Sequence, residues 1–117
     1  MTVLVFVGDL MFRSRIDGAA RAAGVTLVYP RGGEDAAAAV TTAAPDLVLV
    51  DLALKSADAI AVITAVRAVT PARMVAFGSH VATDALAAAR TAGADQVLPR
   101  SSFTATLPAI LRGEVVA

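Results

Sequence analysis

Leu47-Val48-Leu49-Val50 is a short, uninterrupted apolar run that ends directly before an acidic residue, Asp51. The run Val3-Leu4-Val5-Phe6-Val7 repeats this pattern near the start of the chain, before Gly8 and Asp9. Apolar residues that follow one another without alternation are typical of strands covered on both faces, as in a parallel sheet. The two runs therefore predict a parallel sheet with helices on both of its faces.

Further strands and helices alternate along the rest of the chain. Weaker strand candidates are Val25–Tyr29, Met74–Phe77 and Gln96–Leu98. Between the strands lie alanine-rich segments of helical length: Leu10–Ala23, Glu34–Ala44, Asp58–Val69, Thr83–Ala92 and Ser102–Arg112. Alanine is the best helix former, and its small side chain lets a helix pack close to a sheet. Such alternation in one small domain predicts an open, doubly wound α/β sheet.

Glycine and proline residues agree with these boundaries. Gly24 and Gly93 follow two of the predicted helices, where a C-terminal cap is expected. Pro45 and Pro71 lie at helix ends, just before a new strand. Pro108 falls inside the last helical segment, so we expect it to kink that helix or to delay its start.

Composition limits the class of protein. The 117 residues are enough for one domain, so we treat residues 1–117 as a single unit. Ten basic residues balance ten acidic ones, which gives no basic surface for nucleic acid, and Lys55 is the one lysine beside nine arginines. The chain has no cysteine, which excludes disulfides and thiolate chemistry. No apolar run approaches the roughly 18 residues of a membrane span, so we expect a soluble cytoplasmic protein.

Ligands of open α/β sheets bind beyond the carboxyl ends of the strands. The residues expected at that edge are Gly8, Asp9, Asp51, Gly78, Ser79, His80, Pro99, Arg100 and Ser101. If the first and third strands are neighbours, about 4.8 Å apart, Asp9 and Asp51 share a small crevice. Paired carboxylates raise each other's pKa unless a cation joins them, and Arg100 is the cation at this edge.

Each of these residues also has a plainer interpretation. Asp9 is equally well explained as the N-cap of the next helix, whereas a loop separates Asp51 from its helix, so capping explains Asp51 less well. His80 is most simply an exposed loop residue, and Arg100 is either a solvated charge or the structural partner of an aspartate. Arg31–Gly33 resembles a phosphate-binding loop, although a plain turn explains it better.

Several kinds of site are excluded. No G-x-G-x-x-G follows the first strand and no G-x-x-x-x-G-K-[ST] is present, so neither a dinucleotide site nor a P-loop is expected. One histidine without cysteine makes a protein-only zinc site improbable. Ser79, His80 and Asp51 would supply the residue types of a hydrolase triad, but the sequence around Ser79 is no nucleophile elbow. We therefore expect no enzyme.

At these positions the chain resembles a response-regulator receiver domain, the CheY-like, flavodoxin-like fold of two-component signalling, from Val3 to about Leu111. The resemblance implies the strand order 2-1-3-4-5. It also implies that Asp51, at the end of the third strand, stands where the family has its phosphoacceptor. The segment Ala89–Asp95 is typical of the family's approach to the fifth strand, whereas the loop Leu54–Ala59 lacks the usual proline and glycine.

The other family positions have changed. Of the acidic pair after the first strand only Asp9 is present, because Gly8 occupies the other position. The position of the Thr or Ser after the fourth strand is Gly78, with Ser79 next, and Arg100 replaces the lysine of the fifth strand. Mg²⁺ is the one cofactor that the resemblance implies. Its ligands would be Asp9, Asp51 and the Ala53 carbonyl, a weaker set than the octahedral oxygen coordination that Mg²⁺ prefers.

Two functions follow from this comparison. We favour a stand-alone pseudo-receiver that acts through contacts with another protein, a histidine kinase or a downstream signalling partner, without phosphorylation. The resemblance places its contact face on the fourth helix, fifth strand and fifth helix, with Ala85, Leu86, Ala89, Phe103, Leu107 and Ile110. Several of these residues are small or apolar, which suits a homodimer, although their plainer interpretation is that they cover the sheet. The alternative is an atypical response regulator that is phosphorylated on Asp51, with Arg100 in place of the lysine. Small-anion or nucleotide binding near Arg100 is a third, weaker hypothesis.

Overall fold

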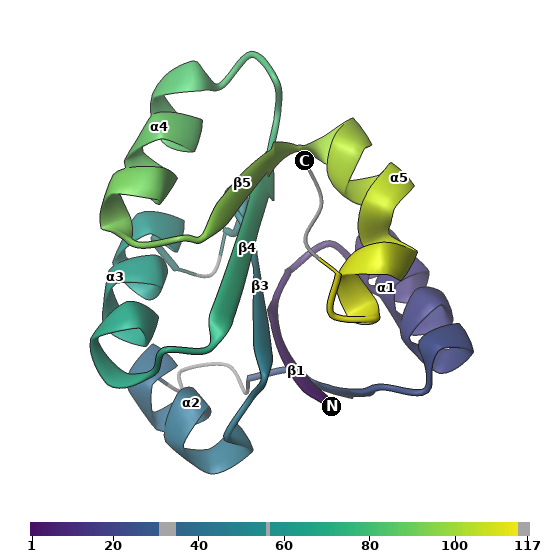
Figure 1. The fold of residues 1–117 in the computed structure, drawn as a ribbon. Helices are drawn as coiled ribbons and strands as arrows, with labels where there is room; N and C mark the ends of the chain where they lie inside the picture. Colours follow the sequence, from purple (N-terminus) through teal and green to yellow (C-terminus); the bar gives the residue numbers. More distant parts are fainter. Residues whose placement is uncertain (31–34, 56, 115–117) are drawn as a thin grey trace.

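The computed structural model describes residues 1–30, 35–55 and 57–114, in which strands and helices alternate (Figure 1). The strands are β1 (Thr2–Phe6), β2 (Thr26–Val28), β3 (Leu47–Asp51), β4 (Arg73–Gly78) and β5 (Gln96–Pro99). The helices are α1 (Leu10–Ala23), α2 (Ala36–Ala43), α3 (Ala59–Val69), α4 (Thr83–Ala92) and α5 (Arg100–Leu111). Every predicted strand and helix is therefore present.

The strands form one parallel sheet in the order β2-β1-β3-β4-β5. This order confirms the doubly wound, flavodoxin-like α/β fold. Val3 lies opposite Leu47 and Leu47 opposite Arg73, so the central strands are in close register. The carboxyl ends of the strands consequently meet at one edge of the sheet, where β1 and β3 are neighbours.

Helices cover both faces of the sheet (Figure 1): α1 and α5 pack on one face, and α2, α3 and α4 on the other. Successive residues of a strand point to opposite faces of the sheet. Val5, Leu49 and Phe77 pack beneath α1 and α5, whereas Leu4 and Val50 belong to the core on the opposite side. Burial on both faces explains why the central strands read as unbroken apolar runs.

The helix ends follow from local sequence. Asp9, Asp35 and Asp58 each accept a hydrogen bond from a first-turn backbone N–H, which caps α1, α2 and α3. Gly24 and Gly93 end α1 and α4 with φ angles of 72° and 125°, as predicted. Within the described residues, no helix is long and apolar enough to cross a membrane.

The last helix differs from the prediction. It begins at Arg100, two residues before the expected start, and continues through Pro108 to Leu111. The expected delay is therefore wrong. Pro108 is exposed and lies in the last turn, where its missing N–H costs the helix one hydrogen bond at most. The early start places Arg100 at the first position of α5 rather than in the strand.

Candidate functional site

Asp51 and Arg100 form an ion pair at the carboxyl edge of the sheet. Asp51 is the last residue of β3 and is 3% exposed, and it is the one buried charged residue among those described. A guanidinium nitrogen of Arg100 donates to Asp51 Oδ1 at 2.9 Å, and the backbone N–H of Ala53 donates to the same oxygen at 2.9 Å. The structure thus selects the interpretation of Arg100 as the partner of an aspartate.

Aromatic rings hold the Arg100 guanidinium in place. Its central carbon lies 5.2 Å from the ring centroid of Phe12 and 5.4 Å from that of Phe77. Phe12 stacks on Phe77 with centroids 5.2 Å apart, and Phe77 stacks on Phe103 at 3.9 Å. Cation–π attraction favours this placement and limits the freedom of the arginine. The sequence did not predict this ring stack, although Phe77 is the next-to-last residue of β4 and Phe12 and Phe103 lie in the first turns of α1 and α5.

A pocket of about 550 Å³ opens beside the ion pair. It is lined by Gly8, Asp9, Phe12, Asp51, Ala53, Lys55 and Arg100. Asp9 and Asp51 therefore border one pocket, as the strand order predicted. Asp9 is exposed, and its Oδ1 accepts from the Phe12 backbone N–H at 3.0 Å, so it also acts as the N-cap of α1.

The oxygen ligands of this pocket fit Mg²⁺ poorly. Octahedral Mg²⁺ is commonly bound by one or two free carboxylates and by waters. Here one carboxylate is neutralised by Arg100 and the other caps a helix, while Gly8 contributes none. Within the described residues, no three acidic, histidine or cysteine side chains are placed to hold one metal ion. The Asp9, Asp51 and Ala53 set therefore stays a prediction without support from the geometry.

The hydroxyl side chain that the resemblance expects at Gly78 would crowd Leu52. It ends β4 opposite Pro99, and a Cβ atom there would lie 3.2 Å from both Cβ and Cδ1 of Leu52. The neighbouring Ser79 is exposed, and its hydroxyl accepts from the Val81 backbone N–H at 3.4 Å. The contact with Leu52 thus favours a residue without a side chain at position 78, and Ser79 lines a neighbouring pocket that also contains Arg100.

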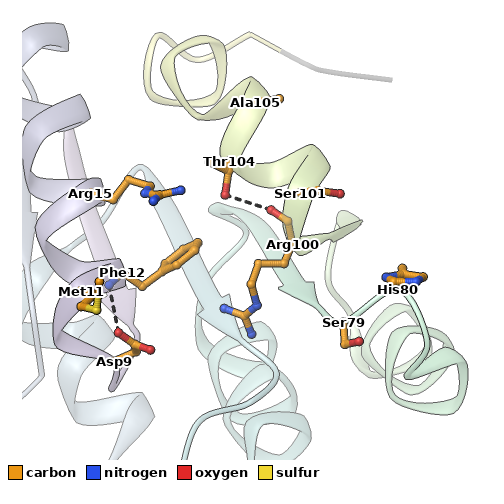
Figure 2. A pocket seen from close by; sticks show the side chains of 10 residues that line it. All are labelled: Asp9, Met11, Phe12, Arg15, Ser79, His80, Arg100, Ser101, Thr104 and Ala105. Carbon is orange, nitrogen blue, oxygen red and sulfur yellow. Dashed lines mark hydrogen bonds between the residues drawn. The ribbon is translucent and has the colours of Figure 1, made fainter.

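A second, larger pocket of about 850 Å³ lies between the beginnings of α1 and α5 and the β4–α4 connection (Figure 2). It is lined by Asp9, Met11, Phe12, Arg15, Ser79, His80, Arg100, Ser101, Thr104 and Ala105. His80 is exposed, as its plainer interpretation predicted. Ser79 and His80 line this pocket, and Asp51 lines the smaller one. The Arg31–Gly33 segment lies outside the described residues.

The apolar contact face proposed on α4, β5 and α5 is wrong in its residues. Ala89, Phe103, Leu107 and Ile110 are at most 2% exposed, because they pack against the sheet. Ala85 and Leu86 are half-buried. The four buried side chains belong to the core and are unavailable to a partner, so a homodimer through these elements would need Ala85, Leu86 or exposed residues.

The fold is that of response-regulator receiver domains. The sequence itself matches no known family profile and no curated protein. Similar solved structures include the receiver domain of a DNA-binding response regulator (merR) from Colwellia psychrerythraea 34H, with 16% identity and a TM-score of 0.76 over 95% of this chain and 98% of that one.

Two further receiver structures match comparably. The BeF3-activated N-terminal receiver domain of RstA from Klebsiella pneumoniae is 19% identical, with a TM-score of 0.77 over 96% of this chain and 99% of that one. The receiver domain of Francisella response regulator 1452 is 17% identical, with a TM-score of 0.78 over 94% and 92%. The whole described sheet and its helices thus have counterparts in receiver domains.

Proposed function

We propose that this chain is a receiver-like signalling domain of the two-component type that acts through contacts with other proteins, without phosphorylation of Asp51. The observation that carries the proposal is the Asp51–Arg100 ion pair, buried at Asp51 and beside a pocket with few free carboxylates. A phosphoacceptor carboxylate must attack phosphorus while cations offset the charge of the incoming group. In this chain the cation at that place, the Arg100 guanidinium, is already hydrogen-bonded to Asp51.

Two substitutions support the same conclusion. Gly8 removes a carboxylate that would help to hold a divalent cation, and Gly78 removes the hydroxyl that an aspartyl phosphate would engage. Arg100 carries the charge of the family's lysine on a planar fork of different reach, so the exchange is not conservative. Three of the positions on which receiver chemistry depends have therefore changed.

The alternative, an atypical phosphoacceptor, has one observation in its favour. Asp51 lines the 550 Å³ pocket, and both hydrogen bonds that the structure gives its side chain go to Oδ1. Oδ2 would then attack a phosphoryl donor, forming the new P–O bond while the donor's leaving group departs. Arg100 would pair with the phosphoryl oxygens.

The partner in this proposal is another protein, a histidine kinase or a downstream signalling protein in the cytoplasm, with no role for nucleic acid or a membrane. A second copy of the chain bound across α4, β5 and α5 stays a prediction. Measuring molecular mass across a dilution series tests it, and a monomer at every concentration would remove the homodimer.

The phosphorylation state is tested by intact mass spectrometry after incubation with excess Mg²⁺ and a small phosphoryl donor. We expect no gain of a phosphoryl group, either in the natural chain or in Asp51→Asn. A receiver domain with the complete set of acidic residues, lysine and hydroxyl serves as the positive control. An adduct that is present in the natural chain and absent from Asp51→Asn would establish the alternative.

A further inference from the structure

The 850 Å³ pocket is lined by an arginine, Arg15, that takes no part in the Asp51–Arg100 ion pair. Arg15 projects from α1 toward the beginning of α5, across the pocket from Ser101 (Figure 2). It is exposed, and the structure shows it in no hydrogen bond or ion pair with any described residue. An arginine without a partner on the wall of a pocket is available for an anionic ligand.

Arg100 contributes to the same pocket. One of its terminal nitrogens pairs with Asp51, and the rest of its planar donor group has no partner among the described residues. Its side chain is 34% exposed, so this remaining edge is accessible. Among the described residues that line the pocket, Asp9 is the one acid, and its Oδ1 accepts from the Phe12 backbone N–H. The charges of Arg100 and Asp51 offset each other, so the pocket offers unused guanidinium donors rather than an excess of positive charge.

The donors suit a phosphate group better than a carboxylate. Two guanidinium forks and the exposed hydroxyl of Ser101 offer more N–H and O–H donors than two carboxylate oxygens can use. Arginine forks bind phosphate with two parallel hydrogen bonds, and a phosphate monoester presents three charged or partly charged oxygens.

Part of the remaining wall is apolar. Met11 is 85% exposed at the pocket, and Phe12 and Ala105 complete this side. A volume of about 850 Å³ lies within the range of small-molecule sites, well beyond the need of inorganic phosphate. An organic body attached to the phosphate would cover the apolar wall.

We infer that this pocket is a binding site for a small organic phosphate monoester, whose phosphate lies between Arg15 and Arg100 and whose body contacts Met11. Binding is reversible and transfers no group, so it is separate from any chemistry at Asp51. It also goes beyond the proposed function, because it gives the domain a small-molecule ligand.

The test is a titration of the ¹⁵N-labelled chain with adenosine 5′-monophosphate at constant ionic strength, followed by amide chemical shifts and without Mg²⁺. We expect saturable shifts at Arg15, Ser101 and Ser102, and weaker binding of inorganic phosphate at the same amides. Arg15→Gln lowers the affinity about ten-fold, the effect of losing a charge-assisted hydrogen-bonded pair. Arg15→Lys keeps the charge but loses the planar guanidinium, so its affinity should lie between those of the natural chain and Arg15→Gln.

Arg21→Gln is the matched control, because Arg21 is another exposed arginine of α1 and is absent from the pocket lining. It should leave the affinity within two-fold, and spectra without ligand verify that each variant is folded. The inference is overturned if the pocket amides do not shift, if both glutamine variants weaken binding equally, or if adenosine shifts these amides as far as its monophosphate. The mass measurement on Asp51 is independent of all these outcomes, so either proposal can fail alone.

Discussion

The Arg100 guanidinium lies 2.9 Å from Asp51 Oδ1 and over the rings of Phe12 and Phe77. The pair joins residues 49 positions apart, from the end of β3 and the beginning of α5. Because Asp51 is buried and Arg100 half-buried, the arginine supplies a fixed counter-charge inside the protein.

The first prediction concerns the strength of this pair. Arg100→Met keeps an apolar side chain beside the rings but leaves the Asp51 carboxylate with the Ala53 N–H alone, which should lower the free energy of unfolding by about 2 kcal/mol. Asp51→Asn should cost about 1 kcal/mol, because Arg100 can turn toward solvent. Urea unfolding of the double variant gives the coupling, expected at about 1–2 kcal/mol. Strictly additive effects would show that the ion pair contributes nothing.

The second prediction concerns the close approach at Gly78. Gly78→Thr should lower the free energy of unfolding by about 1–3 kcal/mol, because its Cβ would lie 3.2 Å from two atoms of Leu52. Combining it with Leu52→Ala should cost less than the sum of the two changes. Gly18→Ala in α1, where nothing lies within 4 Å of the new Cβ, is the control and should stabilise by about 0.5–1 kcal/mol. A threonine variant as stable as the natural chain would contradict the packing argument.

Much of the fold could be predicted from sequence because its signals are local. The apolar runs at Leu47–Val50 and Val3–Val7, the alanine-rich helices and the glycine caps all depend on residues near one another in the chain. The bounds of α1 were predicted to the residue, since Asp9 and Gly24 mark both of its ends. The start of α5 was missed because no side chain caps it.

The site was predicted only in part. Parallel topology was enough to bring Asp51 and Arg100 to one edge, but not to show which atoms meet there. The phenylalanine stack depends on side-chain directions across three elements, for which the sequence has no local signal. By contrast, Phe103, Leu107 and Ile110 lie four and three residues apart, a spacing that places them on one helix face, and all three are buried, as their plainer interpretation held.

The third prediction separates the two interpretations of Asp9. Asp9→Ala removes the N-cap of α1 and should lower the free energy of unfolding by about 1 kcal/mol, whereas Asp9→Ser keeps a capping oxygen and should cost little. Both values should be the same with and without millimolar Mg²⁺ in the unfolding buffer. If Mg²⁺ stabilises the natural chain and not Asp9→Ser, Asp9 is a metal ligand after all.

The fourth prediction concerns Arg67, which joins α3 to the connection before β5. It donates to the carbonyls of Gly93, Thr70 and Ala72 and to the Asp95 carboxylate, at 2.7 to 3.1 Å. Lysine has one nitrogen and cannot serve these acceptors together, so Arg67→Lys should destabilise by about 2 kcal/mol in urea unfolding. Arg21→Lys, on the exposed side of α1, should change stability by less than about 0.5 kcal/mol. Equal effects of the two changes would refute a structural role for the Arg67 fork.

The fifth prediction concerns Tyr29, whose pKa lies well above the ordinary value. Burial is the main cause, and the hydrogen bond that its hydroxyl donates to Asp17 at 2.7 Å adds to it, together with the charge of Asp17. The Arg13 guanidinium, 4.4 Å above the ring, opposes this increase in the pKa. The folded protein therefore favours the neutral phenol.

This raised pKa makes stability depend on pH in one direction. Below pH about 10 the phenol is neutral in both the folded and unfolded chain, so the stabilisation is fully present. Above that pH the unfolded chain ionises first, and stability falls, by no more than about 1 kcal/mol per pH unit after solvent screening. Tyr29→Phe should lack this slope between pH 9 and 11, as measured by urea unfolding. Because the chain has one tyrosine, the ultraviolet absorbance of phenolate follows this group alone. A titration midpoint near 10 in the folded protein would show that the hydrogen bond to Asp17 does not hold the proton.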